Sequence, residues 1–369
     1  MTPFQLEIQI TAVVVAVACA LPGVFLVLRR MALMSDAISH SILLGIVLAF
    51  FVVQDLASPL LIIAATLTGV LTISLVELLN KTGLVREDAA IGLVFPALFS
   101  IGVILISRYA GDVHLDTDAV LRGELALVPF DRFSLFGFDL GPRAFALMLG
   151  ILLLNILFIT LFYKELKLAT FDAALAAVLG FSPGLIHYGL MTIVSVTAVG
   201  AFDAVGSILV VALMVAPPAA AYLLTDRLGR MILLSAIIGA ASAVSGYWLA
   251  DVLDASIAGC MATMSGVAFG ITFLIAPHRG IVAIARRRHR QRWEFARITL
   301  AIHLLNHEST PEAETENCFD TLHEHVYWDR TFIDKLVSQM ERGKLVFIDN
   351  RQLVLTDSGR QLAGQAMMG

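Results

Sequence analysis

The chain has 369 residues with a formal net charge of −5; 58% of them are hydrophobic and only 15% are charged, and the mean hydropathy is +0.85. This composition excludes an ordinary soluble globular domain and indicates a protein that lies mostly within a membrane. The three cysteines, Cys19, Cys260 and Cys318, are far apart in the sequence and support neither a disulfide framework nor a cysteine zinc cluster.

Nine apolar runs are long enough to cross a bilayer as helices, which takes about 20 residues each. They are expected near residues 8–28, 34–53, 58–79, 89–107, 144–163, 185–202, 204–224, 231–250 and 256–277. The continuous stretch 185–224 can form two helices joined at 200–206, or one helix and a re-entrant segment, and the charges near the span ends favour two helices. Residues 1–283 are therefore predicted to be an all-α polytopic membrane domain.

Basic residues near the span ends predict how the chain is oriented. They fall in alternate loops of the nine-span count, at Arg29, Arg30, Lys81, Arg86, Lys164, Lys167, Arg227, Arg230 and from Arg279 onward. By the positive-inside rule these loops face the cytoplasm, so the N-terminus is expected outside and the C-terminal tail inside. The loop 108–143 mixes basic and acidic residues and is long, so its charges count for less.

Asp36 and His40 are the most informative residues of the apolar part. They lie four positions apart in the second predicted span, so their side chains share one helix face. Ionisable groups within a bilayer are costly unless they face a partner, a cavity or a transported ion. The pair offers one oxygen and one nitrogen ligand to a divalent metal. The alternative is that Ser35 or Asp36 caps the helix and that His40 only packs.

Glycines mark further features along the spans. Gly180 is expected to end a short helix that begins at Phe171, in the loop between the fifth and sixth spans. Gly239 with Ala243, and residues 266–270 with a glycine at each end, have the small-xxx-small spacing that allows helices to approach closely.

Residues 284–369 form a separate region of different composition. A basic run at 286–292 is read as a positive-inside anchor at the membrane edge. Helices are expected at 293–305, 318–326 and 330–341, followed by two strands around Asp349 and Asn350 and a closing helix from Thr356. This order is that of a winged helix, so the region is predicted to be a small cytoplasmic α+β domain.

The tail contains several histidines that are candidate ligands of a regulatory metal ion: His303, His307, His323 and His325. His303 and His307 share a helix face at positions i and i+4. Surface histidines without any metal are the simpler interpretation. The regulatory hypothesis is that metal accumulating in the cytoplasm binds the tail and slows transport.

Several motifs resemble those of bacterial metal-ion permeases of the ATP-binding-cassette type, which import manganese, zinc or iron. Residues 28–45 read LRRMALMSDAISHSILLG, residues 164–172 read KELKLATFD, residues 201–219 read AFDAVGSILVVALMVAPPA, and the last span ends in Ala276 and Pro277. The similarity covers about residues 8–283. The tail segments LVSQMERGKLV at 336–346 and LTDSGRQLA at 355–363 resemble the winged-helix domain of repressors of the diphtheria-toxin-repressor type.

The resemblance implies a permease subunit in the bacterial cytoplasmic (inner) membrane. Such a subunit pairs with a second permease, identical or related, takes its ion from an external solute-binding protein and is driven by a cytoplasmic ATPase. The chain has no GxxxxGK[ST] phosphate loop, so it is not expected to be an enzyme or to hydrolyse ATP itself. No permanently bound cofactor is expected, since the metal is the transported substrate.

The same resemblance assigns roles to individual residues. Asp36 and His40 match the aspartate and histidine that hold the ion in the translocation path. Because an aspartate and a histidine without cysteine suit a harder ion, manganese is favoured over zinc or iron. The loop 164–183 matches the segment that contacts the ATPase, and its candidate contact residues are Glu165, Phe171, Asp172, Leu179 and Gly180.

The tail also allows a second function, that of a membrane-tethered, metal-responsive transcription regulator. Residues 284–369 hold twelve acidic and twelve basic side chains, so they have no strong positive footprint for nucleic acid. DNA is therefore not an expected partner, and a packing or regulatory module is preferred. An intramembrane hydrolase is a more distant possibility, since neither HExxH nor GxSxG occurs in the sequence.

Overall fold

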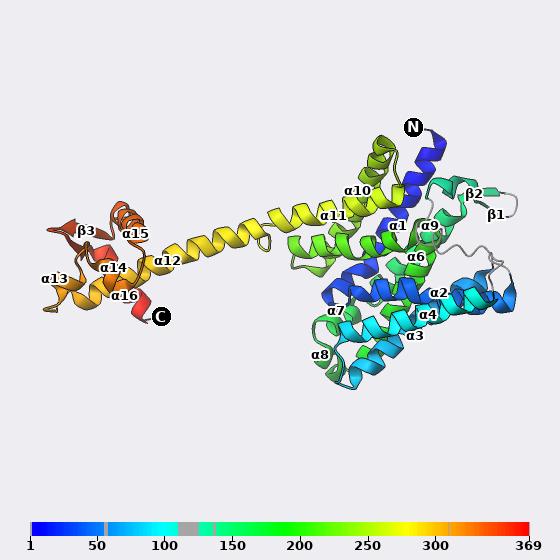
Figure 1. Cartoon of the computed structure of the whole chain (residues 1–369), viewed down its shortest axis with the longest axis horizontal. Helices are drawn as coiled ribbons and strands as arrows, with labels where there is room; N and C mark the ends of the chain where they lie inside the picture. The colour runs from blue at the N-terminus through cyan, green and yellow to red at the C-terminus, as the bar shows by residue number, and fades with distance from the viewer. Residues whose placement is uncertain (1, 55–57, 110–124, 136–137, 309, 369) are drawn as a thin grey trace. The chain divides into compact units, whose positions relative to one another are not determined.

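The computed structural model divides the chain into two compact units, Met1–Gly280 and Ile281–Gly369 (Figure 1). It describes all residues except 1, 55–57, 110–124, 136–137, 309 and 369, and at 59, 133–135, 138–140 and 203 it describes the backbone alone. Much of the loop 108–143 and the side chain of Asp203, between the sixth and seventh predicted spans, therefore lie outside the described residues.

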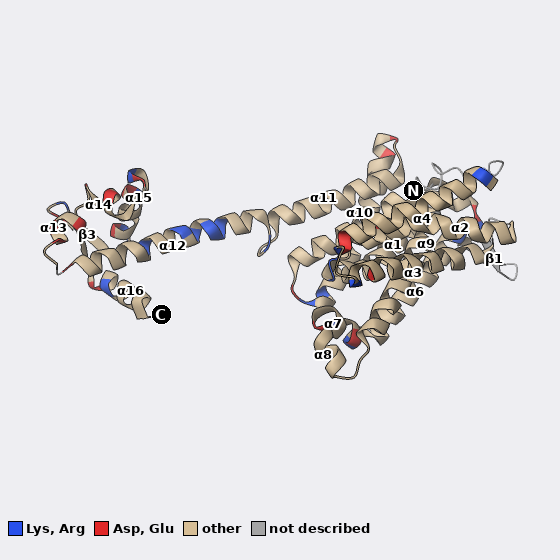
Figure 2. Ribbon diagram, turned by 60° about the horizontal axis from the view of Figure 1, so that its bottom comes forward, with Lys and Arg blue, Asp and Glu red and all other residues tan. Residues whose placement is uncertain are grey.

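Within the described part of the first unit, nine helical segments are long and apolar enough to cross a membrane. They belong to α1 (Pro3–Leu28), α2 (Leu33–Val53), α3 (Pro59–Lys81), α4 (Glu87–Tyr109), α6 (Arg143–Leu161), both halves of α9 (Pro183–Leu224), α10 (Leu228–Leu253) and α11 (Ile257–Ile275). These segments coincide with the nine runs predicted from hydropathy. Figure 2 shows that charged residues are sparse along these helices.

Shorter elements connect the long helices. The 3₁₀ helix η1 (Leu125–Phe130) and the antiparallel strands β1 (Arg132–Leu135) and β2 (Phe138–Pro142) precede α6. The helices α7 (Tyr163–Phe171) and α8 (Ala173–Val178) lie between α6 and α9. The short helix expected to end at Gly180 is present as α8, but it begins at Ala173 and not at Phe171. The helix α7 ends at Phe171, and Asp172, with a φ of −152° and a ψ of 89°, separates the two helices.

The chain reverses direction within α9, as the charge pattern predicted. Gly206 has a φ of 76° and a ψ of 163°, a conformation that glycine adopts readily and that breaks the helix. The amide of Asn155 donates to both Ala18 O, at 2.9 Å, and Thr197 Oγ1, at 3.0 Å, while Met214 in the second half of α9 packs on Gly23. A straight helix would separate residues 197 and 214 by about 25 Å, whereas residues 18 and 23 of α1 are only about 7.5 Å apart along the axis. Both halves of α9 therefore run along α1 in opposite directions.

Small residues let the helices of this unit pack closely, as the spacing of Gly239 and Ala243 predicted. A Cβ on Gly239 would lie 3.3 Å from Ala16 O of α1, and one on Gly45 of α2 would lie 2.6 Å from Ala64 O of α3. Close packing at residues 266–270 is not found: a Cβ on either glycine there would meet no described atom within 4 Å. That part of the prediction is wrong for contacts within the chain, because α11 leaves this face without a neighbour among the described residues.

The second unit consists of α12 (Ile281–His307), α13 (Ala313–Glu316), α14 (Leu322–Val326), α15 (Arg330–Arg342), the antiparallel hairpin of β3 (Val346–Asp349) and β4 (Gln352–Leu355), and α16 (Asp357–Met368). Its own hydrophobic core includes Leu300 and Leu304 of α12, Leu336 and Met340 of α15, and Leu353 of β4. The element order agrees with the order expected from the sequence, except for the short helix α13, which was not predicted.

One boundary in this unit differs from the expectation. The helix predicted from Cys318 begins only at Leu322, because Cys318 forms an antiparallel bridge with Gln352 of β4. The amide of Phe319 donates to Arg351 O and that of Leu353 donates to Asn317 O, each at 2.9 Å. The Phe319 amide and the Asn317 carbonyl are therefore bonded to the edge of the hairpin, which keeps residues 317–319 out of the helix.

Candidate metal site and coupling segment

Asp36 and His40 lie on one face of α2, as their spacing predicted. His40 Nε2 is 3.4 Å from Asp36 Oδ1, and the two side chains are 30% and 41% exposed in the single chain. A separation of about 3.4 Å is also what two ligands at 2.0–2.2 Å from a tetrahedral metal ion would have. The pair is thus arranged so that one cation can touch both groups, and its exposed side leaves room for further ligands.

The imidazole of His40 is held by aromatic rings of α4. Its ring centroid lies 5.9 Å from that of Phe95, nearly parallel to it, and 6.0 Å from that of Phe99, edge to face. These contacts fix the ring while leaving Nε2 directed at Asp36. His40 therefore packs and presents a ligand atom at the same time.

The interpretation of Ser35 or Asp36 as the cap of this helix is wrong. The N-cap residue of α2 is Ala32, and no side chain caps it. The Ser35 hydroxyl donates to Ala32 O at 2.9 Å, so it satisfies a carbonyl and not the free amides of the first turn. The serines around the pair are engaged in the same way, with Ser39 Oγ donating to Ser35 O at 2.8 Å. Asp36 is thus left to face His40.

The segment expected to contact the ATPase is built from two short helices with well-defined ends. Asp172 Oδ1 accepts a hydrogen bond of 2.8 Å from the Leu175 amide and so caps α8. At the other end Gly180 has a φ of 87°, its amide donates to Ala177 O, and the Phe181 amide donates to Ala176 O. This pair of bonds is a Schellman motif, which explains the glycine.

This segment presents apolar side chains outward. Phe171, Leu175, Val178 and Leu179 are 60%, 45%, 84% and 57% exposed. Asp172 and Gly180 are exposed beside them, and Glu165 is half-buried. A groove lined by Tyr163, Lys167, Phe171 and residues 226–230 adjoins the segment. Clustered apolar groups on a polar connecting segment are typical of a docking surface for another protein.

Arg29, directly after α1, links this segment to the helix bundle. Its Nε donates to Thr170 Oγ1 of α7 at 3.2 Å, and its Nη1 lies 3.1 Å from His187 Nδ1 of α9. Burial lowers the pKa of the guanidinium, but arginine stays protonated at neutral pH. One cation therefore joins the end of α1 to α7 and to α9.

Glu77 of α3 continues the same network. Its Oε1 lies 3.5 Å from His187 Nε2, and its Oε2 accepts hydrogen bonds from Tyr188 OH and from Lys81 Nζ, the latter at 3.4 Å. The sequence interpretation missed these residues. Glu77 and His187 are nevertheless ionisable residues inside predicted spans. The same signal singled out Asp36 and His40, and it also marks this network.

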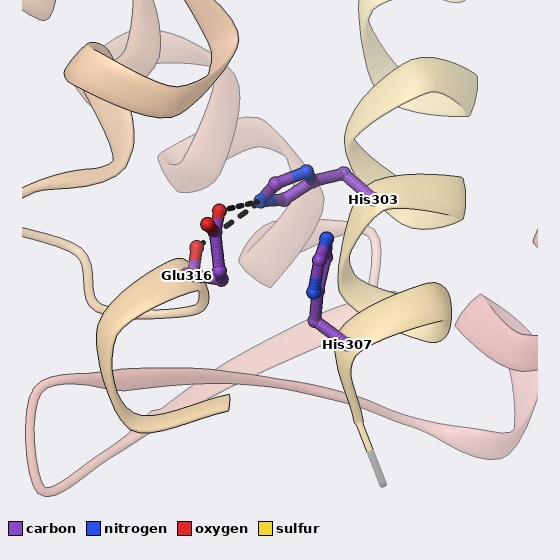
Figure 3. Close-up of side chains that lie close together, drawn as sticks. All are labelled: His303, His307 and Glu316. Carbon is purple, nitrogen blue, oxygen red and sulfur yellow. Dashed lines mark hydrogen bonds and ion pairs between the residues drawn. The ribbon is translucent and has the colours of Figure 1, made fainter. Parts of the chain in front are cut away.

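The structure brings together three of the four tail histidines. His303 and His307 of α12 lie beside Glu316 of α13, with one ligand atom of each residue within 4.8 Å of the others (Figure 3). His325 Nδ1 of α14 is 3.0 Å from Glu316 Oε2. His323 is differently engaged, with its Nε2 3.9 Å from Glu324 Oε1. Glu316, which was absent from the predicted ligands, is the residue that connects them.

Comparison with known proteins places this architecture in a family. Residues 1–276 match the model described as the ABC 3 transport family. The chain is 49% identical over 358 residues to the zinc transport system membrane protein TroD of Treponema pallidum, with 97% of each chain covered. It is 50% identical over 279 residues to the manganese transport system membrane protein MntD of Bacillus subtilis, with 76% of this chain and 94% of MntD covered.

A solved structure agrees with these matches. A chain of PsaBC from Streptococcus pneumoniae, solved in complex with Fab, is 30% identical and superposes with a TM-score of 0.63 over 76% of this chain and 94% of its own length. The family model ends before the second unit, whereas the match to TroD extends through most of it.

Proposed function

We propose that Asp36 and His40 bind the metal ion in transit through this chain. The chain belongs to the ABC 3 transport family and is the multi-pass permease subunit of an ATP-binding-cassette metal importer. ATP hydrolysis belongs to a separate subunit in this family, so the chain itself is a transport subunit and not an enzyme. The observation that carries the proposal is the 3.4 Å approach of a carboxylate oxygen and an imidazole nitrogen on one face of a membrane-spanning helix.

Manganese is the proposed ion, with zinc or iron as alternatives. An oxygen and a nitrogen ligand without cysteine favour a hard or borderline divalent ion. Related chains are named for zinc, manganese or iron transport, so relatedness alone does not select the metal. A site with two ligands from this chain also binds weakly enough to release its ion, which transport requires.

The remaining ligands are proposed to come from water and from a second permease subunit, identical or related. Asp36 and His40 are 41% and 30% exposed in the isolated chain, so their open side can face such a partner. A bare carboxylate and imidazole facing lipid would be costly, which favours an arrangement in which a second subunit or a water-filled path covers them.

Metal uptake by reconstituted vesicles tests the site. Vesicles would contain the permease with its cognate ATPase and solute-binding protein and would be offered Mn²⁺, Zn²⁺ or Fe²⁺ separately. Asp36→Ala and His40→Ala should each reduce uptake at least about tenfold, since loss of even an outer-shell partner costs about 10–100-fold. Asp251→Ala on α10 and His289→Ala on α12 are matched controls that should transport normally. Unchanged uptake in both site variants would overturn the assignment.

The segment formed by α7 and α8 and ended by Gly180, called the coupling segment from here on, is proposed to dock the cytoplasmic ATPase. Phe171 and Leu179 would enter a cleft of that subunit, with Glu165 and Asp172 placing polar groups beside them and Gly180 ending the docking helix. This orientation puts α7, α8 and the second unit in the cytoplasm and the N-terminus outside, where a solute-binding protein would deliver the ion. The hydrogen bonds from Arg29 give ATPase movements a direct route to α1 and α9.

The second unit is proposed to be a winged-helix domain that serves packing or regulation. Support comes from its order of four helices, α12 to α15, a hairpin and a closing helix, and from the bridge that adds Cys318 to the edge of the hairpin. Its α15 would be the helix that enters DNA in a regulator. The balance of twelve acidic and twelve basic side chains over residues 284–369 argues against that use. A gel-shift survey with the full-length protein should detect no sequence-specific DNA binding; specific binding would favour the regulator.

A further inference from the structure

The strongest unassigned site in the molecule joins three helices of the second unit. His303 and His307 come from successive turns at the end of α12, Glu316 from α13 and His325 from α14. Figure 3 shows the imidazoles of His303 and His307 beside each other, with the Glu316 carboxylate directed at His303. The two ring centroids are 4.8 Å apart. His303, His307 and Glu316 thus bring nitrogen and oxygen atoms from two segments into one small volume, and His325 adjoins it through Glu316.

The distances suit a metal ion with little rearrangement. Ligands at 2.0–2.2 Å from a tetrahedral ion are about 3.4 Å from one another. Glu316 Oε2 lies 3.0 Å from His325 Nδ1 and 3.8 Å from His303 Nε2, which brackets that value. The ligand atoms of His303, His307 and Glu316 are all within 4.8 Å, so rotations of the side chains are enough to bring them to one ion.

The hydrogen bonding of the cluster leaves an imidazole nitrogen without a partner. His303 Nε2 lies 3.1 Å from Glu316 O, and it would exchange this backbone contact for the ion on binding. His307 Nδ1, by contrast, is buried and meets no hydrogen-bond partner among the described residues. A buried polar atom in that state carries a free-energy cost unless something satisfies it. A cation coordinated by His307 would remove this cost.

We propose that His303, His307, Glu316 and His325 form a second metal site, separate from Asp36 and His40, that binds a divalent transition-metal ion. Imidazole with one carboxylate suits Zn²⁺, Fe²⁺ or Co²⁺ better than Ca²⁺ or Mg²⁺, which prefer oxygen ligands. Occupation ties α13 and α14 to the end of α12. The site is argued from the second unit alone, so it stands whether or not the first unit transports metal.

Cobalt binding to the full-length protein tests the proposal directly, because tetrahedral Co²⁺ with nitrogen ligands gives visible absorption bands. All proteins would carry Asp36→Ala and His40→Ala, so that the cargo site contributes nothing to the signal. This parent should bind one Co²⁺ with visible bands, and excess Zn²⁺ should displace it. Adding His303→Gln with His307→Gln should weaken binding at least about tenfold. Adding His323→Gln, a histidine of the same unit outside the cluster, should leave binding unchanged.

A structural role for these side chains is separated from a ligand role by a second variant. His325→Gln lies on α14 and is 28% exposed, so it removes one ligand with little effect on packing. It should weaken Co²⁺ binding while the near-ultraviolet circular dichroism of the metal-free protein stays the same. Parent and double variant with identical Co²⁺ titrations would overturn the proposal, as would equal loss of the bands in the His323→Gln protein.

Discussion

Arg29 acts through two different nitrogens of one guanidinium group. Nε donates to Thr170 of the coupling segment while Nη1 contacts His187 of α9, so the residue fixes the distance between these elements. A lysine ammonium is a single point charge at the end of a flexible chain and cannot reach both partners with the same geometry. The identity of the residue, and not only its charge, is therefore expected to matter.

Arg29→Lys should lower ATP-driven uptake on the order of tenfold, because a hydrogen bond to a charged group contributes about 1.5–3 kcal/mol and 1.4 kcal/mol corresponds to a factor of ten. Uptake and ATP hydrolysis measured in the same vesicles give the number of ions moved per ATP, and this ratio should fall. Arg30→Lys is the matched control, since the neighbouring side chain is exposed. Equal ratios for both variants and the natural protein would show that the Arg29 contacts do not transmit the movement.

At the level of elements, the coupling segment depends on a side-chain cap. Asp172 interrupts the backbone between α7 and α8 and accepts the hydrogen bond of the Leu175 amide. Without this cap the first turn of α8 loses its only side-chain partner among the described residues and frays. The exposed Leu175 and Val178 would then no longer be held as one surface.

Asp172→Ala should reduce the affinity of the permease for its ATPase about fivefold, since loss of an N-cap costs about 1 kcal/mol. Asp172→Asn keeps an oxygen that can accept the same hydrogen bond and should bind nearly as well as the natural protein. Titration of the detergent-solubilised permease with the ATPase subunit measures both affinities. A loss of the same size in the asparagine variant would point to the charge of Asp172 and not to its cap.

The hairpin of the second unit contains a strained turn. Asn350 and Arg351 join β3 to β4 with φ values of 46° and 69°, as a type I′ turn requires. Asparagine tolerates this region, but an arginine there costs about 1–2 kcal/mol, and the second position usually holds glycine. Among the described residues, a substitution of Arg351 would remove one side-chain contact, an ion pair of 3.7 Å with Asp320. This ion pair is exposed and therefore weak.

Arg351→Gly should therefore stabilise the hairpin by about 1 kcal/mol. Amide hydrogen exchange of residues 346–355 in the full-length protein should slow about fivefold, whereas Asn350→Gly should change it less. Faster exchange in Arg351→Gly would mean that the ion pair or the entropy of glycine outweighs the relief of strain.

The sequence predicted elements well where one local signal decides them, and failed where distant residues meet. Hydropathy located the spans, and the spacing of Asp36 and His40 placed them on one face. The helix that Gly180 ends was predicted, but α7 was missed because its residues include Lys164, Glu165 and Lys167 and so lie outside every apolar run. Glu77 and Glu316 were missed because their partners, His187 and His303, lie on other helices, and only packing brings them together.

At the scale of the whole molecule, the remaining prediction is the orientation in the membrane. The nine spans found among the described residues put the two ends of the first unit's chain on opposite sides, and the basic loops favour the cytoplasm for the side that carries Arg29, Lys81 and Arg227. Cys318 would then lie in the cytoplasm, and the loop at Asp254 between α10 and α11 would lie outside.

A membrane-impermeant maleimide applied to intact cells should leave Cys318 unlabelled and should label it once the membrane is opened. Cys19 and Cys260 are buried in spans and should react in neither case. With Cys318 replaced by serine, Asp254→Cys should show the reverse behaviour and react in intact cells. Gly229→Cys, in the groove beside Tyr163 and Phe171, should react only after the membrane is opened. Labelling of Cys318 in intact cells would show that the orientation is the opposite one. The coupling segment would then lie on the side where no ATP is available.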